Sequence, residues 1–214
     1  MSGERTSGGL APIRWLYGLL DNPTVYQLVQ HATAPGYKRL FGRFLGSLRP
    51  EDVAPSDHLD VGCGPESVLW DLGLLPVGVD ISVAYGAEWK RRGQRYVVAS
   101  STELPFPDQT FGCVWSFGLF HHLNDDDLAL TLKEMVRVCR VGGTINAVDN
   151  FMPESWLPNP IPRALRKLDR GRHVRQLDDL VTRFPKPHSW KTTRAKYTYT
   201  GLEAVAIRAV RLAI

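Results

Sequence analysis

The chain has 214 residues, of which 43% are hydrophobic and 22% are charged. A chain of this length can bury one sizeable core, and the composition excludes a disordered chain. The net charge of +4 is unevenly spread: residues 1–150 hold 13 Lys/Arg against 17 Asp/Glu, whereas residues 151–214 hold 13 against 5.

Targeting and redox signals are weak. No apolar run approaches the ~20 residues of a membrane-spanning helix, and the short run from Leu16 to Leu20 lacks a signal-peptide cleavage site. The cysteines, Cys63, Cys113 and Cys139, are odd in number and scattered. Because this spacing suits neither a disulfide framework nor a zinc site, we expect a reducing, cytoplasmic setting.

The N-terminal part is expected to be a tail followed by helices. Residues 1–9 are rich in Gly and Ser, which is typical of a disordered tail. Within residues 10–57, Asn22-Pro23 is a helix start signal. One apolar stripe at helical spacing follows, formed by Tyr37, Leu40, Phe41, Phe44, Leu45 and Leu48.

From His58 to about residue 150 the pattern changes to short strands that alternate with helices. The predicted strands are His58–Val61, Pro76–Asp80, Arg95–Ala99, Phe111–Phe117 and Thr144–Val148. The predicted helices are Ser67–Leu74, Ala84–Arg92, and one capped at Asn124–Asp127 that ends at Gly142-Gly143. This alternation predicts a parallel sheet with helices on both faces.

Residues 151–214 are expected to differ from this core. Several prolines predict an irregular crossover, and residues 163–182 favour two helical pieces broken near Gly171. The last two strands are expected at His188–Tyr197 and Leu202–Val210. Their short connection can join antiparallel strands only, so we expect a mostly parallel α/β sheet with an antiparallel last strand, within one domain over residues 10–214.

The first predicted strand leads directly into a glycine turn, in the stretch Asp60-Val61-Gly62-Cys63-Gly64. The turn itself is formed by Gly62, Cys63 and Gly64. Without side chains the backbone can turn sharply and approach a ligand at the carboxyl edge of the sheet. A dinucleotide loop would have a third glycine where this chain has Ser67, and the Lys-Ser/Thr pair of a nucleoside-triphosphate loop is missing. A pyrophosphate is therefore a poor fit.

Asp80 ends the second predicted strand, twenty residues after Asp60. A carboxylate there can accept hydrogen bonds from both hydroxyls of a ribose. Together, the glycine turn, Asp60 beside it and Asp80 suit a nucleoside with a cationic amino-acid tail. The alternative is that Gly62 and Gly64 only form a tight turn and that Asp80 only caps a helix.

Four segments together resemble class I S-adenosylmethionine-dependent methyltransferases, most closely the type 11 group of ubiquinone/menaquinone C-methyltransferases and small-molecule methyltransferases. In order and spacing, the matching segments are Leu59–Pro65, Val77–Asp80, Leu104–Phe111 and Glu134–Gly143. The resemblance covers roughly residues 58–150 and implies the family's seven-stranded, Rossmann-like sheet with S-adenosyl-L-methionine as cofactor.

The resemblance also implies roles for single residues. Asp60, Gly62, Cys63 and Gly64 would face the methionine part of the cofactor. Asp80 would bind the ribose and Ile81 would pack on the adenine. The adenine end would also involve Ser100, Ser101 and Thr102, where Ser100 replaces an aspartate that many relatives have.

The fourth predicted strand leads to the expected acceptor side of the site. Ser116 would lie beside the cofactor, and His121 or His122 could remove a proton from an oxygen or carbon acceptor. Either histidine could instead only brace the loop. Asp149 and Asn150 end the fifth strand at the same edge, where a loop cap is the favoured role. We expect no metal, because the aspartates near the histidines are better explained as a helix N-terminus.

The basic residues of the last third are expected near the acceptor in this family's layout. They are Arg163, Arg166, Lys167, Arg170, Arg172 and Arg175. They favour a small-molecule or lipid-linked acceptor that can be anionic, with peripheral membrane contact. A solvated face explains them at least as well, and nucleic acid is disfavoured because no nucleic-acid module accompanies them. Two alternatives to a methyltransferase remain: a silent or regulatory protein with this fold, and an NAD-linked oxidoreductase.

Overall fold

A computed structural model describes Gly42 and residues 53–152, 173–186, 188–196 and 203–213. The expected tail over residues 1–9 lies outside the described residues, as do the N-terminal helices except for Gly42 and residues 53–57. The same holds for the basic stretch from Arg163 to Arg172.

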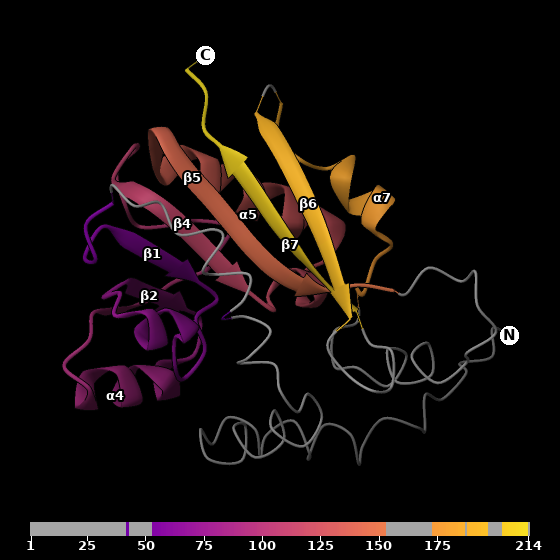
Figure 1. Ribbon diagram of the computed structural model, residues 1–214. Helices are drawn as coiled ribbons and strands as arrows, with labels where there is room; N and C mark the ends of the chain where they lie inside the picture. Colours follow the sequence, from indigo (N-terminus) through magenta and orange to yellow (C-terminus); the bar gives the residue numbers. More distant parts are fainter. Residues whose placement is uncertain (1–41, 43–52, 153–172, 187, 197–202, 214) are drawn as a thin grey trace, which may run out of the picture.

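The described core is a seven-stranded sheet with the order β3-β2-β1-β4-β5-β7-β6 (Figure 1). The strands are β1 (His58–Val61), β2 (Val77–Asp80), β3 (Tyr96–Val98), β4 (Phe111–Phe117), β5 (Cys139–Asn150), β6 (Ser189–Lys196) and β7 (Glu203–Val210). The first five strands are parallel to one another, while β7 pairs antiparallel with both β5 and β6. The expected mostly parallel sheet with an antiparallel last strand is confirmed.

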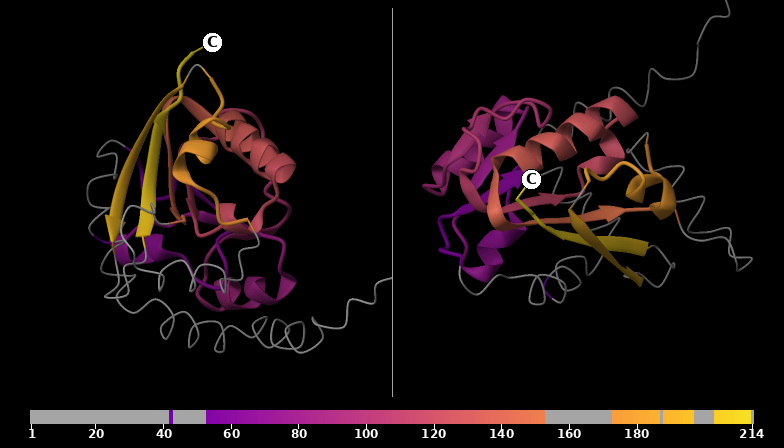
Figure 2. Two further views of the ribbon diagram at one scale, coloured as in Figure 1. Left: turned by 90° about the vertical axis from the view of Figure 1, so that its right-hand side faces the viewer. Right: turned by 90° about the horizontal axis from the view of Figure 1, so that it is seen from above.

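Two apolar clusters lie on the two faces of this sheet. The α5 helix (Asp125–Val138) and the short α7 helix (Leu177–Val181) lie together on one face (Figure 2). Their buried residues join Val77, Val79 and other strand residues in the larger cluster. Gly78 points the other way and contacts Trp89 of α4 (Val83–Arg91), so helices cover both faces.

The α5 helix begins as its sequence predicts. Asn124 is the N-cap, and its side-chain oxygen accepts a hydrogen bond from the backbone N–H of Asp127 at 2.9 Å. The end of the helix differs from the prediction, because α5 stops at Val138 rather than at Gly142-Gly143. Cys139 is already extended and pairs with Phe111 of β4.

Gly142 and Gly143 belong to β5 and serve a close approach of backbones. Gly142 has φ +78, and a Cβ atom on Gly143 would lie 2.7 Å from the carbonyl oxygen of Gly112. The first predicted helix, Ser67–Leu74, is shorter than expected: it is a 3-10 helix, η1, over Val68–Leu72. It ends at Gly73, whose left-handed backbone closes the turn.

Parallel pairing brings the carboxyl ends of the central strands to one edge. Val61 of β1 is in register with Val79 of β2 and Ser116 of β4, and Ser116 is in register with Ala147 of β5. The segments that follow these strands therefore meet at this edge, where open α/β sheets bind ligands.

Candidate functional site

The backbone N–H groups of the glycine turn after β1 donate hydrogen bonds within the protein. Gly62 and Cys63 both donate to the carbonyl oxygen of Val79, at 2.8 and 3.1 Å. Gly62 and Gly64 have φ values of +68 and +62, which favour glycine. A Cβ atom on Gly62 would lie 2.8 Å from the side chain of Leu119, whereas nothing lies within 4 Å of that position on Gly64. The turn is thus closed at Gly62 and open at Gly64.

The carboxylate of Asp80 is held at the end of β2 by two backbone groups. Gly64 N–H donates to Oδ2 and Ser82 N–H donates to Oδ1, each at 3.0 Å. Partial burial raises the pKa of Asp80, while these hydrogen bonds oppose the rise. Each oxygen can accept a further hydrogen bond, so the oriented carboxylate suits a pair of hydroxyl donors.

Asp60 is buried behind the turn. Ser67 Oγ donates to its Oδ2 at 2.5 Å, and Oδ1 has no hydrogen-bond partner among the described residues. Burial, together with the nearby charge of Asp80, raises the pKa of Asp60 to about 7. A cation or a hydrogen-bond donor at this end of the site would stabilise the ionised form of Asp60.

These contacts argue against a phosphate ligand at the turn. The N–H groups of Gly62, Cys63 and Gly64 donate to Val79 and Asp80, so they do not form the inward-facing nest that binds a pyrophosphate. The carboxylate of Asp80 would also repel it. The dinucleotide alternative therefore has little support in the geometry.

The expected adenine end has an apolar surface and a polar turn. Ile81 is 74% exposed, and Val83 and Val98 are also exposed. Ser100 Oγ lies 2.8 Å from Thr102 Oγ1 within a local turn. The Ser101 side chain does not face this edge, because its hydroxyl is buried 2.8 Å from Thr131 of α5.

The segment after β4 joins the donor side to the end of β5. The hydroxyl of Ser116 is buried without a hydrogen-bond partner among the described residues. Leu119 packs on Gly62, and Phe120 N–H donates to Asp149 Oδ2 at 2.5 Å. This segment therefore contacts both the glycine turn and β5.

His121 and Asp149 form a buried pair. Nδ1 of His121 lies 2.5 Å from Oδ1 of Asp149, and both residues are less than 10% exposed. Although burial raises the pKa of Asp149, the attraction of His121 and hydrogen bonds from His121, Asn150 and Phe120 outweigh it and lower that pKa. His122 is exposed, with its ring centroid 4.1 Å from that of His121.

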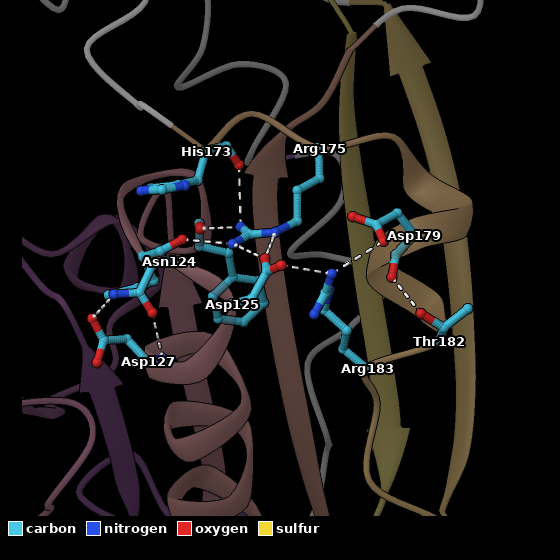
Figure 3. A network of polar contacts seen from close by, with 10 residues as sticks. Asn124, Asp125, Asp127, His173, Arg175, Asp179, Thr182 and Arg183 are labelled. Atoms are coloured by element: carbon cyan, nitrogen blue, oxygen red, sulfur yellow. Dashed lines mark hydrogen bonds and ion pairs between the residues drawn. The ribbon is translucent and has the colours of Figure 1, made fainter.

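Arg175 is part of the framework rather than of a basic surface. It is 8% exposed, and its guanidinium donates to the carbonyl oxygens of Phe120, Leu123 and His173 and to Asp125 of α5 (Figure 3). Because these groups take up its donors, Arg175 does not serve as the anion-attracting residue that the charge pattern suggested.

The His121–Asp149 pair lies beside a small hollow. The residues that line this hollow, which is too narrow for a water molecule, include Phe120, His121, Asp149 and Arg175.

In the described parts of the chain, no group of three or more His, Cys, Asp or Glu side chains could hold a metal ion, and no helix is long and apolar enough to cross a membrane. Of the aspartates after His122, Asp125 accepts a hydrogen bond from Arg175 and Asp127 accepts one from Asn124.

Comparison with known proteins assigns the core to a family. Residues 59–147 match the family described as Methyltransferase domain, in the type 11 group. These residues carry a methyltransferase domain of the class I S-adenosylmethionine-dependent type. The match begins within β1 and ends within β5.

Two relatives illustrate this likeness. A ubiquinone/menaquinone biosynthesis C-methyltransferase of Xanthomonas oryzae pv. oryzae is 39% identical over 101 residues, which is 46% of this chain and 38% of that protein. A probable tRNA methyltransferase 9B of Mus musculus is 31% identical over 127 residues, or 55% of this chain and 27% of that protein. The matches span less than half the length of these curated relatives.

A solved structure shows the same fold as this chain. An S-adenosylmethionine-dependent methyltransferase of Thermotoga maritima, described as a possible histamine N-methyltransferase, has a TM-score of 0.70 at 14% identity. The alignment covers 91% of this chain and 99% of that one. At this identity the likeness shows the fold alone.

The residues around the turn fit the family's cofactor. Asp80 has an oriented carboxylate that can accept hydrogen bonds from two hydroxyls, Gly64 leaves open space beside it, and Asp60 is a buried carboxyl group whose ionised form a cation would stabilise. The sequence did not single out Trp89, whose indole N–H donates to the carbonyl oxygen of Gly64, and it assigned Arg175 to a basic surface rather than to the framework. Their roles depend on hydrogen bonds to backbone carbonyls, which leave no pattern in the sequence.

Proposed function

We propose that this chain binds S-adenosylmethionine at the turn from Asp60 to Gly64 and transfers its methyl group. The observation that carries the proposal is the carboxylate of Asp80, fixed by Gly64 N–H and Ser82 N–H beside a turn that has no N–H groups directed at a phosphate. When bound, the cofactor supplies an electrophilic methyl group on a sulfonium.

The proposal gives each end of the cofactor its own residues. Asp80 accepts hydrogen bonds from the ribose hydroxyls, and the exposed side chain of Ile81 covers the adenine. Asp60 and the Gly62–Gly64 backbone face the methionine part. Ser100 and Thr102 border the adenine, Ser101 contributes through its backbone only, and Ser116 borders the sulfonium end.

For the acceptor we propose a small-molecule or lipid-linked compound that loses a proton as it is methylated. The His121–Asp149 pair supports this class, because an ionised buried carboxylate fixes the imidazole and stabilises its protonated form. The basic residues from Arg163 to Arg172 still favour an anionic acceptor. Arg175 does not, because its guanidinium is bonded to backbone carbonyls and to Asp125. The three cysteines are free and buried, which fits a cytoplasmic protein.

The first experiment measures binding of S-adenosylhomocysteine by isothermal titration. The wild-type chain should bind it, and Asp80→Ala should weaken binding by roughly 1–3 kcal/mol, because two hydrogen bonds to a charged group are lost. Asp108→Ala, a change at an exposed aspartate outside the site, serves as the matched control. A folded wild-type protein that binds no ligand at millimolar concentration would refute the proposal.

The same titration, together with a methylation assay, separates the alternatives. An NAD-linked oxidoreductase would bind NADH more tightly than S-adenosylmethionine. A silent protein would bind S-adenosylhomocysteine but methylate no acceptor from a panel of quinone precursors, phenols and amines.

The role of His121 is tested by the dependence of the rate on pH. If His121 is the base, His121→Gln should lower turnover about 10²–10⁴-fold and remove the acidic limb of the rate profile, leaving cofactor affinity unchanged. His122→Gln changes the exposed neighbour and should keep both the turnover and the profile. Equal turnover in wild type and His121→Gln would return His121 to a bracing role.

A further inference from the structure

Two aromatic residues lie behind the carboxylate that we assign to the ribose. The indole N–H of Trp89, in α4, donates to the carbonyl oxygen of Gly64 at 2.9 Å. The hydroxyl of Tyr96, in β3, donates to the carbonyl oxygen of Ser82 at 2.5 Å. Both carbonyls belong to the residues whose N–H groups hold Asp80.

The result is a symmetric bracket around Asp80. Gly64 gives its N–H to Oδ2 of Asp80 and its carbonyl to Trp89. Ser82 gives its N–H to Oδ1 and its carbonyl to Tyr96. Each residue that orients the carboxylate is thus fixed at both ends.

Two glycines make room for the aromatic rings. A Cβ atom on Gly78 would lie 2.5 Å from the indole of Trp89, and one on Gly86 would lie 2.9 Å from the ring of Tyr96. The ring centroids of Trp89 and Tyr96 are 5.8 Å apart. The aromatic pair is therefore packed against backbone on two elements, and its position is defined by the fold.

We propose that Trp89 and Tyr96 are positioning residues that fix the Asp80 carboxylate for the ribose of the cofactor. Neither side chain touches the ligand in this role. They hold the Gly64 and Ser82 peptides, and these hold Asp80 in the geometry that two hydroxyl donors need. The inference rests on the proposed function, because it requires a ribose at Asp80.

The chain provides a matched control in Trp70. Its ring meets Trp89 edge to face at a centroid distance of 4.6 Å, but its own indole N–H is buried without a partner among the described residues. Trp70→Phe and Trp89→Phe therefore remove a similar ring area, yet only Trp89→Phe removes a hydrogen bond near the site. Tyr96→Phe removes the second hydrogen bond and keeps its ring.

The test is titration of each variant with S-adenosylhomocysteine, together with its urea unfolding curve. Trp89→Phe and Tyr96→Phe should each raise Kd about 3- to 10-fold, as expected for one hydrogen bond. Trp70→Phe should stay within about twofold of wild type. In an Asp80→Asn background the effect of Trp89→Phe and Tyr96→Phe on Kd should largely vanish, because the oriented charge is gone.

A second ligand locates the effect. 5′-Methylthioadenosine keeps the ribose and lacks the amino-acid tail, so it should lose the same factor in both variants. The inference is overturned if Trp89→Phe and Tyr96→Phe bind both ligands as tightly as Trp70→Phe, or lose as much affinity in the Asp80→Asn background. Absence of binding by the wild-type chain would instead refute the proposed function.

Discussion

Asp60 is a buried carboxyl group whose ionisation opposes folding. Its pKa is raised to about 7 in the folded chain, mainly by burial, against an ordinary value of 3.8. Between these two values the unfolded chain binds fewer protons at this group than the folded chain does. Stability therefore falls as pH rises through this window, by up to about 1.4 kcal/mol per pH unit.

Asp60→Asn should remove this contribution. We expect the variant to gain stability relative to wild type as pH rises from about 4 to 7, with a constant difference above that window. Urea unfolding at several pH values measures it. Asp71→Asn, a change at an exposed carboxyl, is the control and should run parallel to wild type. Parallel curves for Asp60→Asn would show that Asp60 is ionised throughout.

At the scale of elements, one arginine ties the segment after β4 to the segment before α7. Arg175 bonds three backbone carbonyls and Asp125 at the start of α5 (Figure 3). Arg183 also forms an ion pair with Asp125, with 2.8 Å between its Nη2 and Oδ2 of Asp125, but the Arg183 side chain is only partly buried. The two arginines thus share a carboxylate in different surroundings.

Arg175→Lys should cost about 2–4 kcal/mol of unfolding free energy, because a lysine cannot replace the planar fork and leaves buried carbonyls unpaired. Arg183→Lys should cost less than about 1 kcal/mol, as partly exposed ion pairs do. Chemical denaturation measures both. Equal losses of unfolding free energy in the two variants would contradict this role of Arg175.

Element boundaries show where local signals were enough. The N-terminus of α5 was predictable, since Asn124 and three aspartates act within one turn. Its C-terminus was not, because Val138 and Cys139 are withdrawn into the core and the pairing of Cys139 with Phe111 ends the helix. Gly142 and Gly143, a plausible helix end in sequence, instead permit a close approach of β5 to β4.

At the scale of the whole molecule, cofactor binding and folding should be linked. A ligand that binds only the folded chain at 100 times its Kd adds about 2.7 kcal/mol to the unfolding free energy. For a chain of this size that is a rise in Tm of roughly 5–10 °C.

Thermal unfolding with S-adenosylhomocysteine should show this rise in wild type and a smaller one in Asp80→Ala at the same ligand concentration. NADH should produce no rise. A rise of equal size with NADH would mean that the site does not discriminate against dinucleotides.

The sequence by itself determined the order of the strands along the chain, the glycine turn, the position of Asp80 at the end of β2 and the antiparallel end of the sheet. These features depend on periodicity, turn chemistry and connection length. Only the tertiary structure decided that His121 pairs with Asp149, that Arg175 is buried in the framework, and that Trp89 and Tyr96 bracket Asp80. Each of these depends on contacts between residues that lie 14 to 55 positions apart in the chain. Such contacts exist only once the sheet has brought its carboxyl ends to one edge.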